Sequence, residues 1–295
     1  MRAVWSFWSK PFHAGSGWHW REPLHHLLAW GLSLRLARAH YPDTVLITDT
    51  PGKTLLVNQL GLNFAHVSTE LDRLRDADPA WWALGKLVAY SLQDKPFVHL
   101  DTDVFLWRPL PERITRAPVL AQYLEPPCSS YEPWIIENAL ATARLDPPVE
   151  WQWYRSLQEH SVGGVNCGIL GGTNISFIQH YARLALDLLQ DPRNSAAYAS
   201  IPFKDGLNPV VEQFVLLACL DFHRLHPDKS FGDVDAKYLF PSSGRAFSPN
   251  EAARLGFTHL MGGAKADANV TRRLEERLRQ EDGRFYEHCV RVTRG

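Results

Sequence analysis

The sequence predicts an α/β fold in which helices flank a mainly parallel sheet. From residue 2 to residue 107, short apolar runs typical of strands alternate with longer stretches of helical periodicity, an order that favours parallel strands. Nearly half of the 295 residues are hydrophobic, which is enough for the core of one large domain. The apolar run 97–107 contains Asp101 and Asp103, and it predicts a buried strand that ends at two carboxylates.

In the first half of the chain we expect strands at residues 2–7, 44–48 and 64–67, and helices at residues 24–40, at 53–60 and from Asp78-Pro79 to Ser91, with Lys86 inside the last helix. The polar and aromatic residues 9–20 predict a loop, and in an α/β fold a loop after the first strand lies near the ligand-binding edge. His25 and His26 are neighbours on a helix and point to different sides, so we interpret them as surface or packing residues.

The second half begins with a predicted strand at residues 119–123. The proline- and tryptophan-rich segment 125–160 predicts an irregular insertion that contains a helix at residues 137–143, and its aromatic side chains favour core packing over sugar stacking. Glycines in segment 162–174 indicate close approach of the backbone to another group. Further predicted elements are helices at residues 175–189, from Asn208-Pro209 to 220 and at 270–281 on the surface, and a strand at 255–260.

Composition narrows the function classes. The formal net charge of −1 gives no basic footprint of a nucleic-acid binder. Four widely spaced cysteines, Cys128, Cys167, Cys219 and Cys289, predict neither a zinc motif nor a disulfide framework. No apolar run is long enough to span a bilayer, and the N-terminal residues do not have the pattern of a signal peptide. We therefore expect a cytoplasmic protein, with peripheral membrane contact and the oligomeric state left open.

The pair Asp101 and Asp103 is the strongest chemical feature. Isolated carboxylates are costly to bury, so a pair at the end of an apolar strand meets a cation or reaches solvent. Two closely spaced oxygen ligands suit Mg²⁺ or Mn²⁺. The motif alone leaves open a plainer interpretation, in which both aspartates are solvated or cap a helix.

Together with three other segments, this pair resembles the metal-dependent glycosyltransferases of the Rossmann-like GT-A fold, most closely family 8, whose members retain stereochemistry, and related uncharacterised bacterial glycosyltransferase-like proteins. The matching segments are Asp101-Thr102-Asp103, the His-x-x-Gly-x-x-Lys pattern of residues 259–265, Asn166-Cys167-Gly168 and Glu212-Gln213. The likeness extends over most of the chain by element order, but by residue only over these segments. It implies a single domain over residues 1–295, with residues 125–160 on the acceptor side.

The resemblance also implies roles for individual residues. Asp101, Asp103 and His259 would bind Mn²⁺ or Mg²⁺. Lys86, Lys265 and Gly262 would contact the diphosphate of a nucleotide sugar, expected to be a UDP-sugar, with Asp49 and Gly168 beside it. Glu212, Gln213 and Asn166 would face the donor sugar and support catalysis. Two departures leave the donor open, since Lys265 is followed by Ala266-Asp267 instead of Pro-Trp, and Glu212 stands where the family carries Asp.

Two other function classes compete with this hypothesis. A haloacid-dehalogenase-type phosphatase also carries Asp-x-Asp after an apolar strand, and its later acidic motif could be Gly232-Asp233-Val234-Asp235. In such phosphatases, however, the nucleophile strand opens the domain, whereas about a third of this chain precedes Asp101. The second alternative is a non-catalytic protein of transferase-like fold that binds a nucleotide or a glycan.

Overall fold

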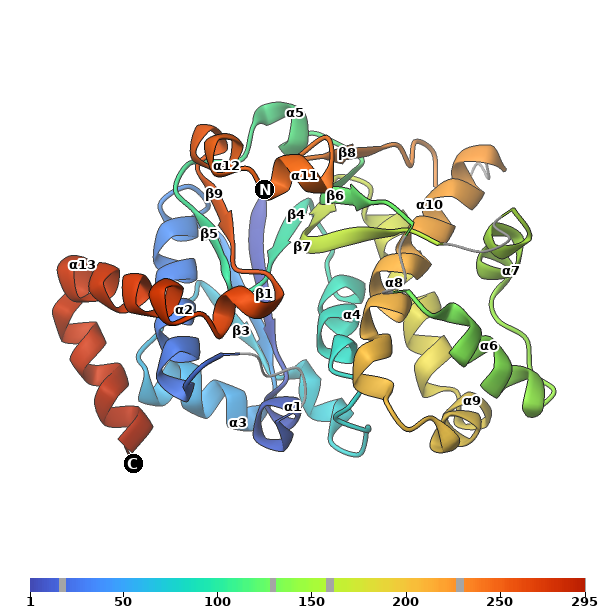
Figure 1. Cartoon of the computed structure of the whole chain (residues 1–295), viewed down its shortest axis with the longest axis horizontal. Helices are drawn as coiled ribbons and strands as arrows, with labels where there is room; N and C mark the ends of the chain where they lie inside the picture. Colours follow the sequence, from blue (N-terminus) through green and yellow to red (C-terminus); the bar gives the residue numbers. More distant parts are fainter. Residues whose placement is uncertain (16–19, 128–130, 158–161, 227–230, 295) are drawn as a thin grey trace.

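The computed structural model describes residues 1–15, 20–127, 131–157, 162–226 and 231–294. A seven-stranded sheet forms its centre, in the order β3-β2-β1-β4-β7-β6-β8, and a two-stranded ribbon pairs β5 with β9 (Figure 1). The strands are β1 (Arg2–Phe7), β2 (Thr44–Thr48), β3 (His66–Ser68), β4 (Phe97–Leu100), β5 (Val104–Leu106), β6 (Val119–Glu125), β7 (Gly164–Gly172), β8 (Ala236–Tyr238) and β9 (Phe257–His259).

Helices connect the strands and cover the sheet. They are α1 (Ser9–Ala14), α2 (Pro23–Arg38), α3 (Thr50–Lys53), α4 (Ala83–Ser91), α5 (Glu112–Thr115), α6 (Pro133–Thr142), α7 (Val149–Ser156), α8 (Ile175–Gln190), α9 (Pro192–Ala197), α10 (Val215–Leu225), α11 (Ser243–Ala246), α12 (Pro249–Leu255) and α13 (Ala268–Arg294). Short 3₁₀ or π turns are η1 (Thr54–Gln59), η2 (Glu70–Leu74), η3 (Tyr198–Ser200), η4 (Lys204–Leu207), η5 (Val210–Phe214) and η6 (Gly262–Lys265).

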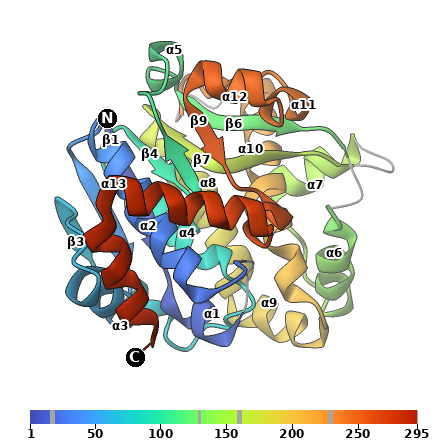
Figure 2. The same ribbon diagram turned by 60° about the vertical axis from the view of Figure 1, so that its left-hand side comes forward.

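The prediction of an α/β fold with a mainly parallel sheet is confirmed. Strands β1 to β4 pair in parallel, whereas β7 runs antiparallel to both of its neighbours, β4 and β6. Alternate residues of β1 enter two cores, as the period of two in a strand requires: Ala3, Trp5 and Phe7 face α2 and α13, and Val4 faces α4. Figure 2 shows α13 lying across α2 on its side of the sheet.

Several predicted boundaries change. Residues 9–14 form helix α1, so the expected loop is only partly correct. Helix α4 begins at Ala83 and not beside Pro79. The Asp78 carboxylate accepts the Ala80 amide and the Lys204 ammonium, and the first helical amide, that of Ala83, donates to buried Asn208 Oδ1 at 2.8 Å. This cap comes from a residue 125 positions away, so no local pattern could reveal it.

The terminal helix begins near its predicted start but is longer than expected. It continues to Arg294 with a break at Asp282, whose backbone is non-helical and whose Oδ1 accepts the Phe285 amide at 3.0 Å. It is also not purely a surface helix, because Leu274, Leu278 and Cys289 are buried in the core beside α2. Many charged residues lie between these buried positions, so the sequence of the helix looks polar and its apolar face was not predicted.

The expected irregular insertion, residues 125–160, consists largely of helices α6 and α7, except for the parts outside the described residues, 128–130 and 158–160. Trp151 is buried, donates to Glu137 Oε1 at 2.7 Å and meets the Phe214 ring edge-on. Trp153 packs on Phe222. Core packing is therefore confirmed for these two tryptophans, and the acceptor contact expected of the segment is not available to the Trp151 ring.

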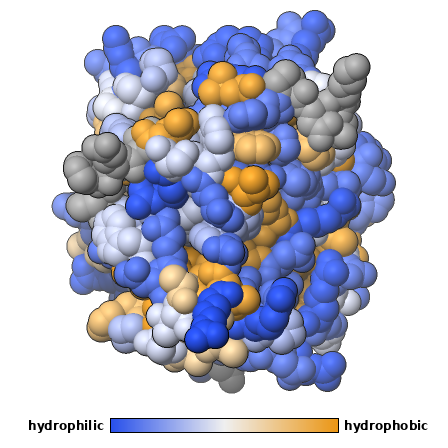
Figure 3. Space-filling view, turned by 90° about the vertical axis from the view of Figure 1, so that its right-hand side faces the viewer, coloured by the Kyte–Doolittle hydropathy of each residue, from blue (hydrophilic) through white to orange (hydrophobic). Residues whose placement is uncertain are grey.

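No helix in the described ranges is long and apolar enough to cross a membrane. Cys167, Cys219 and Cys289 are free and buried, while Cys128 lies outside the described residues. Large exposed hydrophobic side chains include Val149 at the start of α7 and Leu225 at the end of α10. Figure 3 shows the side of the molecule to which these helices belong, where apolar groups are exposed between hydrophilic ones.

Asp49 has a structural role in this fold. Its buried carboxylate accepts the Ser9 amide at 3.0 Å, the Ser9 hydroxyl at 2.6 Å and the Gly52 amide at 2.9 Å, so it caps α3 and ties it to α1. Asp49 does not line the cavity described below, which corrects the expectation that it contacts a nucleotide.

We predict that Asp49→Ala lowers the free energy of unfolding by about 2–4 kcal/mol, since it removes a charged acceptor from three buried donors. Urea denaturation of the variant and of the parent measures the difference. Asp94→Ala is the control, because the Asp94 side chain is 74% exposed. Equal stability of Asp49→Ala and Asp94→Ala would contradict the structural role.

Candidate functional site

The site is built on the turn that separates β4 from β5. The Asp101 amide donates to Gly168 O on β7 at 3.0 Å, and Asp101 O accepts the Val104 amide at 3.0 Å. The first bond continues the β4–β7 ladder to Asp101, and the second closes the turn that leads the chain into the β5–β9 ribbon. Strand β4 therefore ends at the two carboxylates, as the sequence predicted, with Asp101-Thr102-Asp103 at its carboxyl end, and the apolar residues after Asp103 form the separate strand β5.

The ribbon and η6 bring His259 and Lys265 to Asp103. Val104 pairs with His259, and His259 Nε2 lies 3.4 Å from Asp103 Oδ1. Gly262, with a φ of 52°, turns the chain so that Lys265 Nζ reaches Asp103 Oδ2 at 2.6 Å. Burial alone would raise the pKa of Asp103, but Lys265 and His259 outweigh it and hold that pKa well below the usual range.

The orientation of His259 is set from the other side of its ring. His259 Nδ1 lies 2.7 Å from Gln122 Oε1, and an amide oxygen can only accept, so Nδ1 carries a proton and Nε2 is the ring nitrogen that faces Asp103. A methyl group at Gly168 would clash with both Gln122 and His259. Gly168 therefore makes room for this pair and is not exposed to a ligand, because β7 is buried there.

Lys86 neutralises the second carboxylate. From α4 its ammonium contacts Asp101 Oδ1 at 2.9 Å and Glu212 Oε1 at 2.7 Å. Burial would lower the pKa of Lys86, but the two carboxylates raise it above its ordinary value and keep the amine charged. Glu212 is fully buried and also accepts the Tyr90 hydroxyl at 2.8 Å. This corrects the expectation that Glu212 faces a sugar: its role here is to hold Lys86.

Asn166 and Gln213 belong to a neighbouring polar cluster. Asn166 Nδ2 donates to Glu125 Oε1 at 3.0 Å, and the Tyr131 hydroxyl lies 3.1 Å from Glu125 Oε2 and 2.7 Å from Gln213 Oε1. Neither amide lines the cavity beside Asp101. The cluster reaches the site through Met261, whose sulfur lies 3.9 Å from Asn166 Nδ2.

A cavity of about 350 Å³ opens beside Asp101 and Asp103. Its aromatic wall was not predicted residue by residue, although segment 9–20 was expected near the ligand edge. The wall comes from the end of β1, from α1 and from the segments that precede α2 and α4, and it contains Phe7, Trp8, Phe12, Trp20 and Trp82. Lys86, Gly262 and Lys265 also line the cavity.

Two histidines that the sequence did not single out as functional also line this cavity. His26 accepts the Trp30 indole at 2.8 Å, and burial followed by Lys265 lowers the pKa of His26 to about 3. His99 lies 3.0 Å from Ser6 Oγ, and burial followed by Lys86 lowers its pKa. Both rings are therefore neutral at physiological pH. The sequence signal was weak: His26 lies near the start of the predicted helix that follows the aromatic segment 9–20, and His99 lies two residues before Asp101.

The residues fit a divalent cation. One ligand atom each from Asp101, Asp103 and His259 lies within 4.8 Å of the others, and His259 Nε2 faces the Asp103 carboxylate. Three carboxylates (Asp101, Asp103 and Glu212) and two ammonium groups give a formal charge of −1 with neutral histidines. A divalent ion would change this to +1, which attracts a phosphorylated ligand. Carboxylate oxygen and imidazole nitrogen suit Mn²⁺ or Mg²⁺.

Comparison with protein-family models places the chain in a family. The model of the family described as "Family of unknown function (DUF6734)" matches residues 1–292, nearly the whole chain. The chain belongs to this family. No curated protein matches it in sequence. Membership of DUF6734 thus covers residues 1–292, but the description of this family names no reaction and no ligand.

We predict that Lys86→Met lowers the free energy of unfolding at pH 8 by about 3–5 kcal/mol, because it leaves Asp101 and buried Glu212 without their cation. Burial already raises the pKa of Glu212, and loss of Lys86 raises it further. A raised folded-state pKa gives stability that is complete below the unfolded value, about 4.3, and is lost as the pH rises. The deficit should therefore be smaller at pH 5 than at pH 8.

Urea denaturation at both pH values measures this deficit. Lys95→Met is the matched control, since the Lys95 side chain is 54% exposed and lies 3.8 Å from its nearest carboxylate, Asp43. A deficit that does not depend on pH would show that Glu212 is not the group that Lys86 compensates.

Proposed function

We propose that the protein is a metal-dependent glycosyltransferase, which moves a hexose from a nucleotide-diphosphate sugar, expected to be a UDP-sugar, to a glycan or small-molecule acceptor. The observation that carries the proposal is the convergence of Asp101, Asp103, His259 and Lys265 at one cavity. These residues come from segments separated by more than 150 positions. Their convergence supports the resemblance of both motifs to family 8.

The chemistry of the proposed reaction fits this arrangement. A nucleoside diphosphate leaves a sugar easily only when its developing negative charge is neutralised. A divalent ion held by Asp101, Asp103 and His259 would supply Lewis-acid neutralisation. Lys265 adds a cation on the Asp103 side, and Lys86 does so on the Asp101 side. Gly262 leaves the backbone open at the cavity rim.

The cavity wall supports the same ligand class. Pockets of about 300–1,000 Å³ with apolar walls and a few polar groups are typical of small-molecule sites. Trp8, Phe12 and Trp20 offer apolar surface for a nucleobase or a sugar face, opposite the charged residues at the strand ends. Asn166 stays a candidate for the sugar side through its neighbour Met261, and Gln213 through Tyr131. Retention of stereochemistry and a cytoplasmic location remain part of the proposal.

The phosphatase alternative has less support. Its second acidic motif would need to approach Asp101, but Asp233 and Asp235 precede β8 at the far edge of the sheet, with β7 and β6 between them and β4. Asp233 Oδ1 accepts the Asp235 amide at 2.8 Å, and Asp235 pairs with Lys237, so both have local structural roles.

We predict that Asp103→Asn weakens Mn²⁺-dependent UDP binding at least a hundredfold, because the site loses a buried anionic ligand. Titration calorimetry of UDP with and without Mn²⁺ measures the effect, and circular dichroism checks the fold. Asp101→Asn provides a second, more exposed position, and Asp94→Asn is the control. If folded Asp103→Asn and Asp101→Asn both bind UDP as the parent does, the metal site is misplaced.

We predict that Lys265→Ala raises the dissociation constant of UDP–Mn²⁺ about tenfold or more, because a charge-assisted hydrogen bond contributes about 1.5–3 kcal/mol. Lys237→Ala is the control, with a side chain that is 52% exposed and remote from the site. Hydrolysis of UDP-hexoses by the parent with Mn²⁺ separates an enzyme from the non-catalytic binder. Binding without any hydrolysis or transfer would favour the binder.

A further inference from the structure

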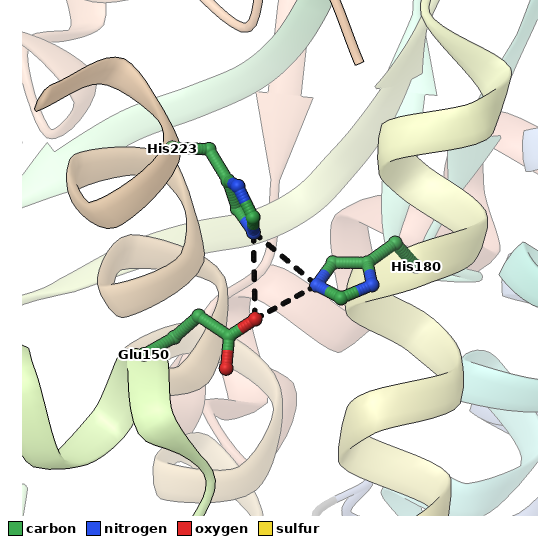
Figure 4. A group of neighbouring side chains, drawn as sticks. All are labelled: Glu150, His180 and His223. Carbon is green, nitrogen blue, oxygen red and sulfur yellow. Dashed lines mark hydrogen bonds and ion pairs between the residues drawn. The ribbon is translucent and has the colours of Figure 1, made fainter. Parts of the chain in front are cut away.

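A second group of metal-ligand side chains lies among the helices on the other side of the sheet from α2. Glu150 comes from α7, His180 from α8 and His223 from α10, and Figure 4 shows their ligand atoms turned toward one another. The group shares no residue with the cavity beside Asp101. In the sequence the three residues are 30 and 43 positions apart and match no metal motif.

The spacing of the three ligand atoms is that of a coordination sphere. His180 Nε2 lies 2.9 Å from Glu150 Oε1, His223 Nε2 lies 3.4 Å from the same oxygen, and the two nitrogens are 3.3 Å apart. Tetrahedral zinc with Zn–N bonds of about 2.0–2.1 Å places neighbouring ligand atoms roughly 3.3–3.4 Å apart. A small adjustment of His180 would therefore complete one face of a tetrahedron.

The surroundings support a cation at this place. The Glu150 and His223 side chains are 5% and 7% exposed, and no lysine or arginine in the described part of the chain forms an ion pair with Glu150. A buried carboxylate is costly, and the ion-pair partners of Glu150 among the described residues are the two histidines, so a metal ion between the three groups would compensate its charge. The ring of Phe231 packs against both histidines, with centroids 4.7 and 4.8 Å away, and restricts how they can turn.

One side of the group is open. The His180 side chain is 32% exposed, and together with Glu150 it lines a cavity of about 890 Å³ between α7 and α8. Three protein ligands and an accessible fourth position are the pattern of zinc sites that keep a water molecule or bind a ligand directly.

We propose that Glu150, His180 and His223 form a zinc-type site, which joins α7, α8 and α10 and leaves its fourth position toward this cavity. Two imidazoles and one carboxylate suit Zn²⁺ better than Mg²⁺, which prefers oxygen ligands and keeps its waters. The proposal does not depend on the glycosyltransferase function, because the two sites have different ligands and different cavities.

The experiment separates the two sites. The Asp103→Asn substitution first disables the site beside Asp101. The metal-free variant is then titrated with Zn²⁺ in a calorimeter. We expect one equivalent of Zn²⁺ to bind, to raise the melting temperature, and not to be displaced by millimolar Mg²⁺. Adding His180→Ala should weaken this binding at least a hundredfold. His180 is the most exposed of the three ligands, so the fold should persist.

Glu150→Gln, which keeps the side-chain volume, provides a second ligand variant in the same background. His226→Ala is the matched control, because His226 follows α10 directly and is exposed but contributes no ligand atom. Loss of Zn²⁺ binding in both ligand variants but not in the control supports the site. Absence of Zn²⁺ binding in Asp103→Asn, or unchanged binding in folded His180→Ala or Glu150→Gln, overturns it and leaves a metal-free hydrogen-bonded triad.

Discussion

The structure depends on cations that compensate the desolvation of two carboxylates, Asp101 and Asp103, at the end of its central strand. Asp103 is 2% exposed and Asp101 lies at the carboxyl end of a strand that is fully buried, so each needs a positive partner. The partners come from segments that are far apart in the sequence, Lys86 from α4 and Lys265 from η6. The order of elements therefore has to bring an early helix and a late turn to the same strand end.

This requirement explains features that are otherwise unconnected. The β5–β9 ribbon exists where the chain leaves the main sheet at Asp103, and it aligns His259 with the carboxylate. The antiparallel strand β7 contributes Gly168, whose missing side chain admits the Gln122–His259 pair. Preorganised groups of this kind hold a charged ligand without rearrangement, because their orientation is fixed by bonds outside the site.

The sequence predicted the fold class, most element positions and the association of Asp101 with Asp103, since these depend on local periodicity and on short motifs. It could not predict roles set by distant partners. Asp49 was expected at a ligand and instead caps α3, and Glu212 was expected at a sugar and instead holds Lys86 in the core. The start of α4 depends on Asn208, so propensity near Pro79 placed it too early. Each difference arises from a tertiary hydrogen bond or ion pair.

The same reasoning separates the two groups of metal-ligand residues. Asp101 and Asp103 are two positions apart on one turn, so their chemistry is visible in the sequence. Glu150, His180 and His223 lie on three helices, and only helix packing brings their ligand atoms within 3.4 Å. The first set is rich in oxygen and has its own lysines, whereas the second is rich in imidazole, and no lysine or arginine of the described residues forms an ion pair with Glu150. Because ligand type governs metal preference, the two proposed sites would favour different ions, an oxygen-preferring ion beside Asp101 and Zn²⁺ at the imidazole-rich group.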